Sequence, residues 1–212
     1  MRLVLATRNE HKLRELGRMM DGVMLEPLPE DVALPPEDGA TFAANALGKA
    51  RAAAAAIGRP AIADDSGIEA AALGGAPGIR SARFAGEDAT DADNLAKLRA
   101  EAPAGSALRY VCVMAYAEPG GGERTFTGVC DGTLAPEPRG SGGFGYDPVF
   151  LPADRSDGRT MAELSDEEKD AISHRGRAAR ALLAWLRSES GAPLTTADDA
   201  HGFRTADEAH RA

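Results

Sequence analysis

The sequence predicts an α/β protein, and three observations carry that prediction. The chain opens with a short apolar run, a polar turn and an amphipathic segment, which is the pattern of a strand followed by a helix. An alanine-rich segment ending in Gly58-Arg59-Pro60 is typical of a helix with a stop signal. Two β-rich runs joined by Glu118-Pro119-Gly120-Gly121-Gly122 are typical of an antiparallel hairpin.

The remaining elements follow from periodicity and from turn residues. A proline- and acid-rich stretch at residues 29–39 predicts a surface loop, and the glycine-rich residues 74–86 predict an irregular connection. Ser165 with Glu168 three positions later forms a capping-box pattern that starts a helix. We expect strands at residues 3–6, 23–28, 61–63, 108–117, 123–134 and 149–151, and helices at residues 13–20, 41–57, 91–101, 165–170 and 174–187.

Composition and charge restrict the class of protein. The chain has 212 residues, 43% hydrophobic and 27% charged, which is ordinary globular composition. A formal net charge of −9 opposes binding to a nucleic-acid backbone, so a small anionic ligand would need local cations or a metal ion. No apolar run approaches the roughly 18 residues that span a bilayer, so we expect a cytoplasmic protein without membrane insertion. Cys112 and Cys130 lie in β-like runs and are expected to be reduced core thiols, with a disulfide as the alternative.

Polar residues at the first strand-to-helix turn are candidates for phosphate binding. Thr7, Asn9 and Lys12 stand there, where unpaired amides and the positive helix terminus favour an anion. The alternative is that Thr7 or Asn9 is only a helix cap and Lys12 only a surface cation. The glycines of a P-loop are absent, so the segment alone leaves both interpretations open.

Adjacent carboxylates are the strongest candidates for a metal site. Asp64 and Asp65 follow the short apolar run at residues 61–63, so we expect them at a strand end, where two charges need neutralisation. Magnesium suits them because it takes few carboxylates and completes its shell with water and phosphate oxygens. Glu37 in the acidic loop is a further candidate ligand, and one of these carboxylates is free to activate water. Asp-Asp pairs are also common in ordinary turns.

Two later segments offer contacts for an organic group. Residues 140–148 combine glycines, which let the backbone approach a ligand closely, with Phe144, whose ring can stack on a base. Lys169, Ser173, His174 and Arg175 crowd a join between helices and can donate to a phosphate or a keto oxygen. A tight core turn and a capped surface helix are the respective structural alternatives.

Together, these segments resemble the inosine triphosphate pyrophosphatase family, also described as dITP/XTP pyrophosphatases. The matching pieces span most of residues 2–187 in order. They are LATRNEHKLREL (5–16), TFAANALGKA (41–50), AIADDSGIEAAALGGAPGIRSARFAGEDATD (61–91), GSGGFGYDPVF (140–150) and AELSDEEKDAISHRGRA (162–178).

The resemblance implies an elongated mixed sheet flanked by helices, in two lobes with a deep central cleft, and a homodimer. It implies Mg²⁺-dependent hydrolysis of deaminated purine nucleoside triphosphates (ITP, dITP, XTP) to the monophosphate and pyrophosphate. Asp65, with Asp64, would be catalytic, and Glu37 and Asp65 would bind the metal. The implied substrate contacts are Thr7, Arg8, Asn9, Glu10, His11, Lys12, Ser66, Phe144, Gly145, Tyr146, Asp147, Lys169, His174 and Arg175.

Departures and rival interpretations complete the prediction. Ala44 stands where bacterial relatives commonly carry Glu. We expect one domain over residues 1–190 and a flexible tail over residues 191–212, which has no counterpart in the family pattern. The alternatives are a Maf-like nucleotide pyrophosphatase and a non-catalytic nucleotide-binding module. The segment SHR (173–175) and the loop FGYD (144–147) argue against the first alternative. The carboxylates of Asp64, Asp65 and Glu37 argue against the second.

Overall fold

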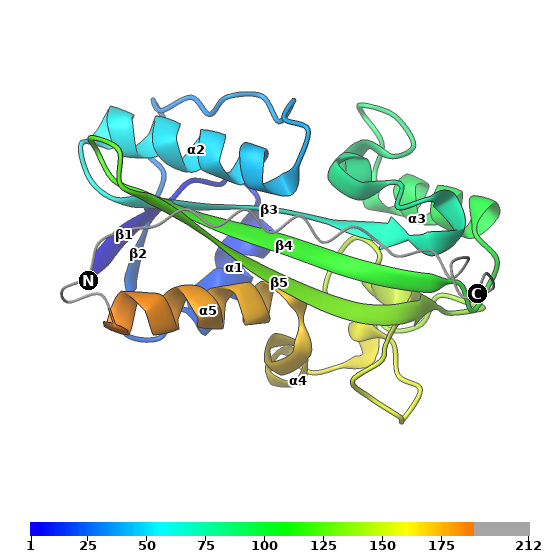
Figure 1. Ribbon diagram of the computed structural model, residues 1–212. Helices are drawn as coiled ribbons and strands as arrows, with labels where there is room; N and C mark the ends of the chain where they lie inside the picture. The colour runs from blue at the N-terminus through cyan, green and yellow to red at the C-terminus, as the bar shows by residue number, and fades with distance from the viewer. Residues whose placement is uncertain (189–212) are drawn as a thin grey trace, which may run out of the picture.

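The computed structural model describes residues 1–188 and contains a six-stranded sheet with helices on both faces (Figure 1). The strands are β1 (Arg2–Leu5), β2 (Met24–Pro27), β3 (Ala61–Ala70), β4 (Ala107–Ala117), β5 (Glu123–Leu134) and β6 (Phe150–Pro152). The α-helices are α1 (Glu10–Met19), α2 (Phe42–Ile57), α3 (Asp91–Glu101), α4 (Asp166–Ile172) and α5 (His174–Ser188). Short 3-10 helices are η1 (Ala71–Leu73), η2 (Gly78–Arg83), η3 (Asp147–Val149) and η4 (Met161–Glu163).

The sheet is mixed, as the resemblance implies. Its strand order is β2-β1-β3-β4-β5-β6, with β1 parallel to both β2 and β3 and the other pairs antiparallel. The predicted hairpin is confirmed, because β4 and β5 pair along their whole lengths. The long strands β3, β4 and β5 extend well beyond β1 and β2, which makes the sheet elongated (Figure 1). The α/β class is therefore confirmed, whereas the division into two lobes about a central cleft stays a prediction.

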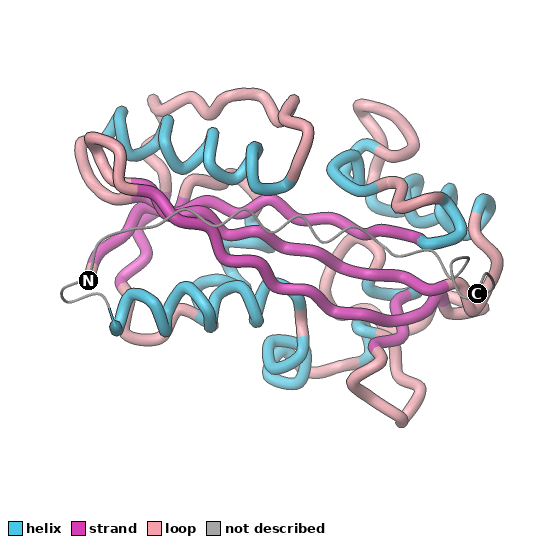
Figure 2. Tube along the Cα trace, viewed as in Figure 1, coloured by secondary structure: helices cyan, strands magenta, loops and turns pink. Residues whose placement is uncertain are grey.

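Alternate residues of each strand face different hydrophobic clusters. On β3, Ala61 and Ala63 pack with α2, whereas Ile62 packs with α1 and α5 on the other face. Figure 2 shows α2 and α5 on opposite sides of the sheet. A third cluster, which includes Leu98 of α3 and Phe150 of β6, covers the far end of the long strands. The two faces of β3 therefore meet different helices.

Helix boundaries follow the predicted signals closely. Thr41 caps the N-terminus of α2 by accepting from the amide of Ala44, and Gly58 ends the helix in a left-handed conformation. The helix expected at residues 91–101 is α3. Ser165 and Glu168 form the expected capping box at the start of α4.

The prediction for the third strand was wrong in its extent. The run expected to end at residue 63 continues as β3 to Ala70, so Asp64 and Asp65 lie inside the strand. The strand was predicted to end there because the apolar run stops where the two carboxylates begin. The strand continues because β4 pairs with every residue of β3, including Asp64 with Met114 and Asp65 with Val113. The carboxylates thus project from the middle of the sheet.

Cys112 and Cys130 are both buried free thiols, which confirms the expectation of reduced core cysteines. No helix among the residues that the structure describes is long and apolar enough to cross a membrane. The predicted tail at residues 191–212 lies outside the described residues.

The approach of α5 to β5 gives a test of the packing. A Cβ at Gly128 of β5 would overlap the carbonyl of His174 and the backbone nitrogen of Ala178. We expect Gly128→Ala to lower the free energy of unfolding by about 1–3 kcal/mol through overpacking. Gly17→Ala is the matched control, since nothing lies within 4 Å of its Cβ and the change should stabilise α1 by up to about 1 kcal/mol. Urea unfolding measures both, and equal effects would contradict the proposed close approach.

Candidate active site

The candidate site lies where β1 ends and β3 continues beyond it. β1 pairs with β3 only at Val4↔Ala61 and Leu5↔Ile62, so this edge of β3 has no strand partner from Ala63 until Pro77 bridges to Glu69. A pocket of about 550 Å³ lies there. Its lining is Thr7, Arg8, Asn9, His11, Lys12, Leu34, Pro35, Glu37, Lys49, Ser66, Gly67, Ile68, Ser81, Ala82, Asp91, Tyr110, Phe144, Gly145, Tyr146, Asp147, Lys169, His174 and Arg175.

Asp64 is a fully buried carboxylate directly beneath this pocket. Its side chain is 0% exposed, and its Oδ2 lies 3.0 Å from Nζ of Lys12 and 3.2 Å from Nη2 of Arg175. Burial alone would raise the pKa of Asp64, but the charges of Lys12 and Arg175 outweigh burial and hold that pKa below its ordinary value. Asp64 therefore stays ionised and ties α1 to α5.

Asp65 points to the opposite face of β3, as neighbouring strand residues do. Its Oδ2 accepts from Nδ2 of Asn45 on α2 at 2.8 Å, and its Oδ1 accepts from the amide of Ser66 at 2.9 Å. Burial raises the pKa of Asp65, the Asn45 hydrogen bond opposes that rise, and the charge of Glu37 adds to it. Asp65 is therefore a more basic carboxylate than Asp64.

The acidic loop carries Glu37 to the same side as Asp65. Its carboxylate pairs with Nζ of Lys49, and its carbonyl accepts from Nη2 of Arg83 at 2.9 Å. Lys49 also donates to the edge carbonyl of Asp64 at 2.6 Å, so this buried ammonium joins the loop to the open edge of β3.

The carboxylates of Glu37 and Asp65 fit a hard cation by their chemistry. Magnesium takes one or two carboxylates and fills the rest of its shell with water and phosphate oxygens. Among residues 1–188 no group of three or more His, Cys, Asp or Glu side chains is arranged to hold a metal ion. A cation at this site would therefore depend on oxygens of a bound ligand as well as on the protein.

The start of α1 combines capping with positive charge. Oδ1 of Asn9 accepts from the amides of His11 and Lys12 at 2.9 and 3.2 Å, so Asn9 is the helix cap that the alternative interpretation named. Lys12 is not a surface cation, because its side chain is only 13% exposed and pairs with Asp64. Arg8 donates to carbonyls of the loop after β2, including Leu28 at 2.8 Å.

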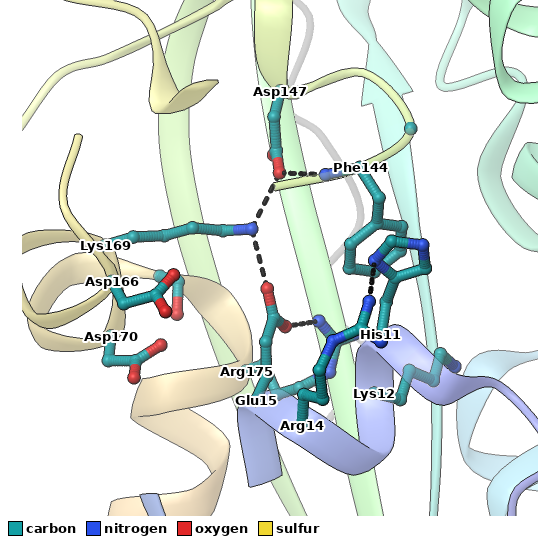
Figure 3. Close-up of polar contacts among 12 residues, drawn as sticks. His11, Lys12, Arg14, Glu15, Phe144, Asp147, Asp166, Lys169, Asp170 and Arg175 are labelled. Carbon is teal, nitrogen blue, oxygen red and sulfur yellow. Dashed lines mark hydrogen bonds and ion pairs between the residues drawn. The ribbon is translucent and has the colours of Figure 1, made fainter. Parts of the chain in front are cut away.

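Glu15 on α1 forms ion pairs with two cations that line the pocket, Lys169 and Arg175 (Figure 3). Its carboxylate lies 2.6 Å from Nζ of Lys169 and 2.5 Å from Nη1 of Arg175. Burial would raise the pKa of Glu15, but Arg175 and Lys169 outweigh burial and lower it. Lys169 also lies 2.7 Å from Asp147, whose other oxygen accepts from the hydroxyl of Tyr110 at 3.0 Å. These charges form a preorganised network.

Phe144 lies beside this network on the glycine-rich loop (Figure 3). Its amide donates to Oδ2 of Asp147 at 2.9 Å. Its ring stacks on His11 at 5.0 Å between centroids and lies 5.3 Å from Nζ of Lys169. A residue far away in the sequence also holds this loop, because the amide of Gly145 donates to Asp91 at 2.8 Å.

His174 is a neutral, buried imidazole in the pocket wall. Its ring stacks on Tyr110 at 4.5 Å between centroids. Burial and then the charge of Arg175 hold the pKa of His174 well below its usual range. Within residues 1–188 its Nδ1 is buried without a hydrogen-bond partner.

Most of the predicted site residues meet in this pocket. Of the predicted substrate contacts, Glu10 alone does not line it; its carboxylate is 84% exposed and pairs with Arg14 on the outer side of α1. Glu37 lines the pocket, whereas Asp64 and Asp65 do not; Asp64 pairs with the lining residues Lys12 and Arg175, and Asp65 accepts from the amide of Ser66. The roles assigned to these residues remain predictions.

Sequence reasoning missed several polar residues of the site. Lys49 lines the pocket, while Asn45 and Glu15 lie behind it and contact residues of the site. Asn45 and Lys49 are four residues apart on the face of α2 that packs on the sheet, among buried alanines. Polar residues at this spacing on an otherwise apolar face were the signal that could have identified them.

The chain is similar to known proteins along most of its length. A dITP/XTP pyrophosphatase of Syntrophobacter fumaroxidans is 47% identical over 205 residues, covering 89% of this chain and 86% of that protein. One of Symbiobacterium thermophilum is 50% identical over 189 residues, covering 87% of this chain and 94% of that protein. A solved HAM1 protein from Coxiella burnetii has a TM-score of 0.79 at 42% identity, with 89% and 99% of the two chains covered.

The model of the Ham1 family matches residues 3–185. The chain therefore belongs to the Ham1 family. This match includes every element that contributes to the pocket, and it favours the resemblance drawn from the sequence over the Maf-like alternative.

The depressed pKa of His174 predicts a pH-dependent stability. Below the unfolded value of about 6.5 the unfolded chain binds a proton that folded His174 does not, so stability falls as pH falls, by up to about 1.4 kcal/mol per pH unit. His174→Gln should make the free energy of unfolding nearly independent of pH between about pH 5.5 and 7. The carboxylates of Asp64 and Glu15, whose pKa values are lowered by folding, change the stability only at about pH 4 and below. Urea unfolding across this range measures it, and identical slopes would contradict a neutral buried His174.

Proposed function

We propose that this protein hydrolyses deaminated purine nucleoside triphosphates, such as ITP, dITP and XTP, to the nucleoside monophosphate and pyrophosphate. The observation that carries the proposal is that one pocket is lined both by the cations Lys12 and Lys49 and by an aromatic ring, Phe144, beside the donor Arg175. The dITP/XTP pyrophosphatases that resemble this chain along most of their length support the same reaction.

The triphosphate binds to cations of two helices, Lys12 at the start of α1 and Lys49 on α2. Lys12 and Lys49 both line the pocket, and each ammonium retains donors beyond its present partners, Asp64 and Glu37. Because the whole chain carries a formal charge of −9, this local concentration of cations is what allows an anion to bind.

The base lies against the ring of Phe144, whose centroid is 5.6 Å from Cζ of Arg175. Arg175 is held there by Asp64 and Glu15 and stays charged, and His174 is neutral, with Nδ1 unpaired. Donors fixed in this way suit the 6-oxo oxygen of a deaminated purine. A 6-amino group would leave them unpaired, which is a strong basis for rejecting ATP.

Asp65 is the base that accepts the proton of the attacking water. The water oxygen bonds to the α-phosphorus, the bond from that phosphorus to the bridging oxygen breaks, and pyrophosphate leaves. Glu37 and Asp65 would hold a divalent metal ion, which we propose is Mg²⁺; it would neutralise charge that develops on the phosphate oxygens. Asp64 is paired with Lys12 and Arg175, so it positions these cations and does not accept the proton.

A homodimer and a cytoplasmic location belong to the same proposal. Nucleotide pools are where an enzyme of this specificity would act, and the family resemblance implies the dimer. We also propose that residues 1–190 form a single domain.

Substrate specificity is tested by pyrophosphate release. ITP, XTP and dITP should be hydrolysed at rates at least about 100-fold above ATP, since the 6-amino group of ATP would leave buried donors unpaired, and such donors discriminate by this much or more. A chelator should abolish the release, and added Mg²⁺ should restore it. Comparable rates with ATP would contradict the recognition of the 6-oxo group, and release in chelator would contradict the metal.

The phosphate site is tested at Lys12. Lys12→Ala should raise the Michaelis constant for ITP by about 10-fold, the effect of losing one charge-assisted hydrogen bond of about 1.5 kcal/mol. Arg51→Ala is the matched control, because it removes the same charge from α2, where Arg51 pairs with Glu123 outside the pocket. Steady-state kinetics compares the two, and an unchanged Michaelis constant in Lys12→Ala would remove this residue from the phosphate site.

A further inference from the structure

We infer that Asn45 is a positioning residue that sets the orientation of Asp65 and its separation from the loop carrying Glu37. The inference rests on the proposed role of Asp65 as the base. Asn45 does not line the pocket and would not touch substrate; it acts through the two groups that its side-chain amide joins.

Both polar atoms of the Asn45 amide are used, at opposite ends. Oδ1 accepts from the backbone amide of Gly39 at 2.8 Å, and Nδ2 donates to Oδ2 of Asp65 at 2.8 Å. A backbone N–H can only donate, so the atom facing Gly39 is the oxygen and the atom facing Asp65 is the nitrogen. The direction of each hydrogen bond is therefore fixed by chemistry.

The bridge is short and tightly packed. Asn45 is 5% exposed, in the first turns of α2. A Cβ on Gly39 would lie 2.6 Å from Oδ1 of Asn45 and 2.9 Å from Cβ of Ala44, so the loop approaches the helix closely only because residue 39 is glycine. Gly39 lies two residues after Glu37, which means that the bridge holds this end of the acidic loop.

The bridge also limits how Asp65 can turn. One carboxylate oxygen is held by Asn45 and the other by the amide of Ser66 at 2.9 Å. Each oxygen keeps a further lone pair for a water molecule or a cation. Asp65 is thus fixed at both oxygens yet still able to accept, which is what a base aimed at one water molecule requires.

Asn45→Asp tests the bridge with little change in shape. The variant keeps an acceptor for Gly39 but sets a carboxylate oxygen against Asp65. We expect kcat for ITP to fall by about 100-fold, the loss typical of a catalytic group displaced by about 1 Å, with the Michaelis constant changed less than about 3-fold. Ala44→Asp is the matched control, since it adds the same charge to the exposed neighbouring position and should stay near wild type.

Exchanging the two residues separates positioning from folding. In Asn45→Asp/Asp65→Asn the amide at position 65 can donate to the carboxylate at position 45, which restores the hydrogen bond in reverse. We expect the melting temperature, measured in chelator, to return from the lowered Asn45→Asp value towards wild type, while kcat stays as low as in Asp65→Asn alone. If Asn45→Asp does not fold, Asn45→Ala, which adds no charge, should still lower kcat at unchanged Michaelis constant.

Three results would overturn the inference: wild-type kcat in Asn45→Asp or in Asn45→Ala, an equal loss in Ala44→Asp, or activity of the exchanged variant well above Asp65→Asn. Failure of the proposed function is recognised separately, because wild-type protein would then release no pyrophosphate from ITP, dITP or XTP. The melting temperatures of the variants would still report on the Asn45–Asp65 hydrogen bond.

Discussion

The architecture of the site depends on one buried charge, the carboxylate of Asp64 in the middle of β3. A lone carboxylate that is removed from water costs several kcal/mol, so it persists in a core only when cations and donors compensate it. Lys12 comes from α1 and Arg175 from α5, and both converge on Oδ2 of Asp64. Compensation of this charge therefore requires both helices to be docked on the same face of the sheet.

This constraint extends outward through Arg175. The guanidinium that neutralises Asp64 also pairs with Glu15, and Glu15 pairs with Lys169, which pairs with Asp147. Charges alternate in sign along this chain, so each member keeps its neighbours ionised and in place. Asp147 in turn accepts from the amide of Phe144, so the proposed base-binding residue is linked to Asp64 and Lys12 without a ligand.

Local patterns predicted most of the fold and much of the site, because periodicity and caps report on short-range structure. Thr41, Gly58 and Ser165 begin or end their helices as expected. The extent of β3 was not predicted, since its continuation past Asp64 depends on pairing with β4, a long-range contact. Lys49 and Asn45 were missed for the same reason: the sequence places them in a helix, and only the packing of α2 on the sheet directs them at the site.

Successive side chains of a β-strand point to opposite faces of the sheet, so the adjacent residues Asp64 and Asp65 lie in different surroundings. Asp64 faces α1 and α5, where cations lower its pKa; Asp65 faces α2, where burial and Glu37 raise it. A turn, which was the structural alternative for an Asp-Asp pair, would have imposed no such separation. Because β1 pairs with only the first two residues of β3, one pocket is lined from both faces, by Lys12 of α1 and by Lys49 of α2, so cations on one face and the proposed base on the other can act on a single ligand.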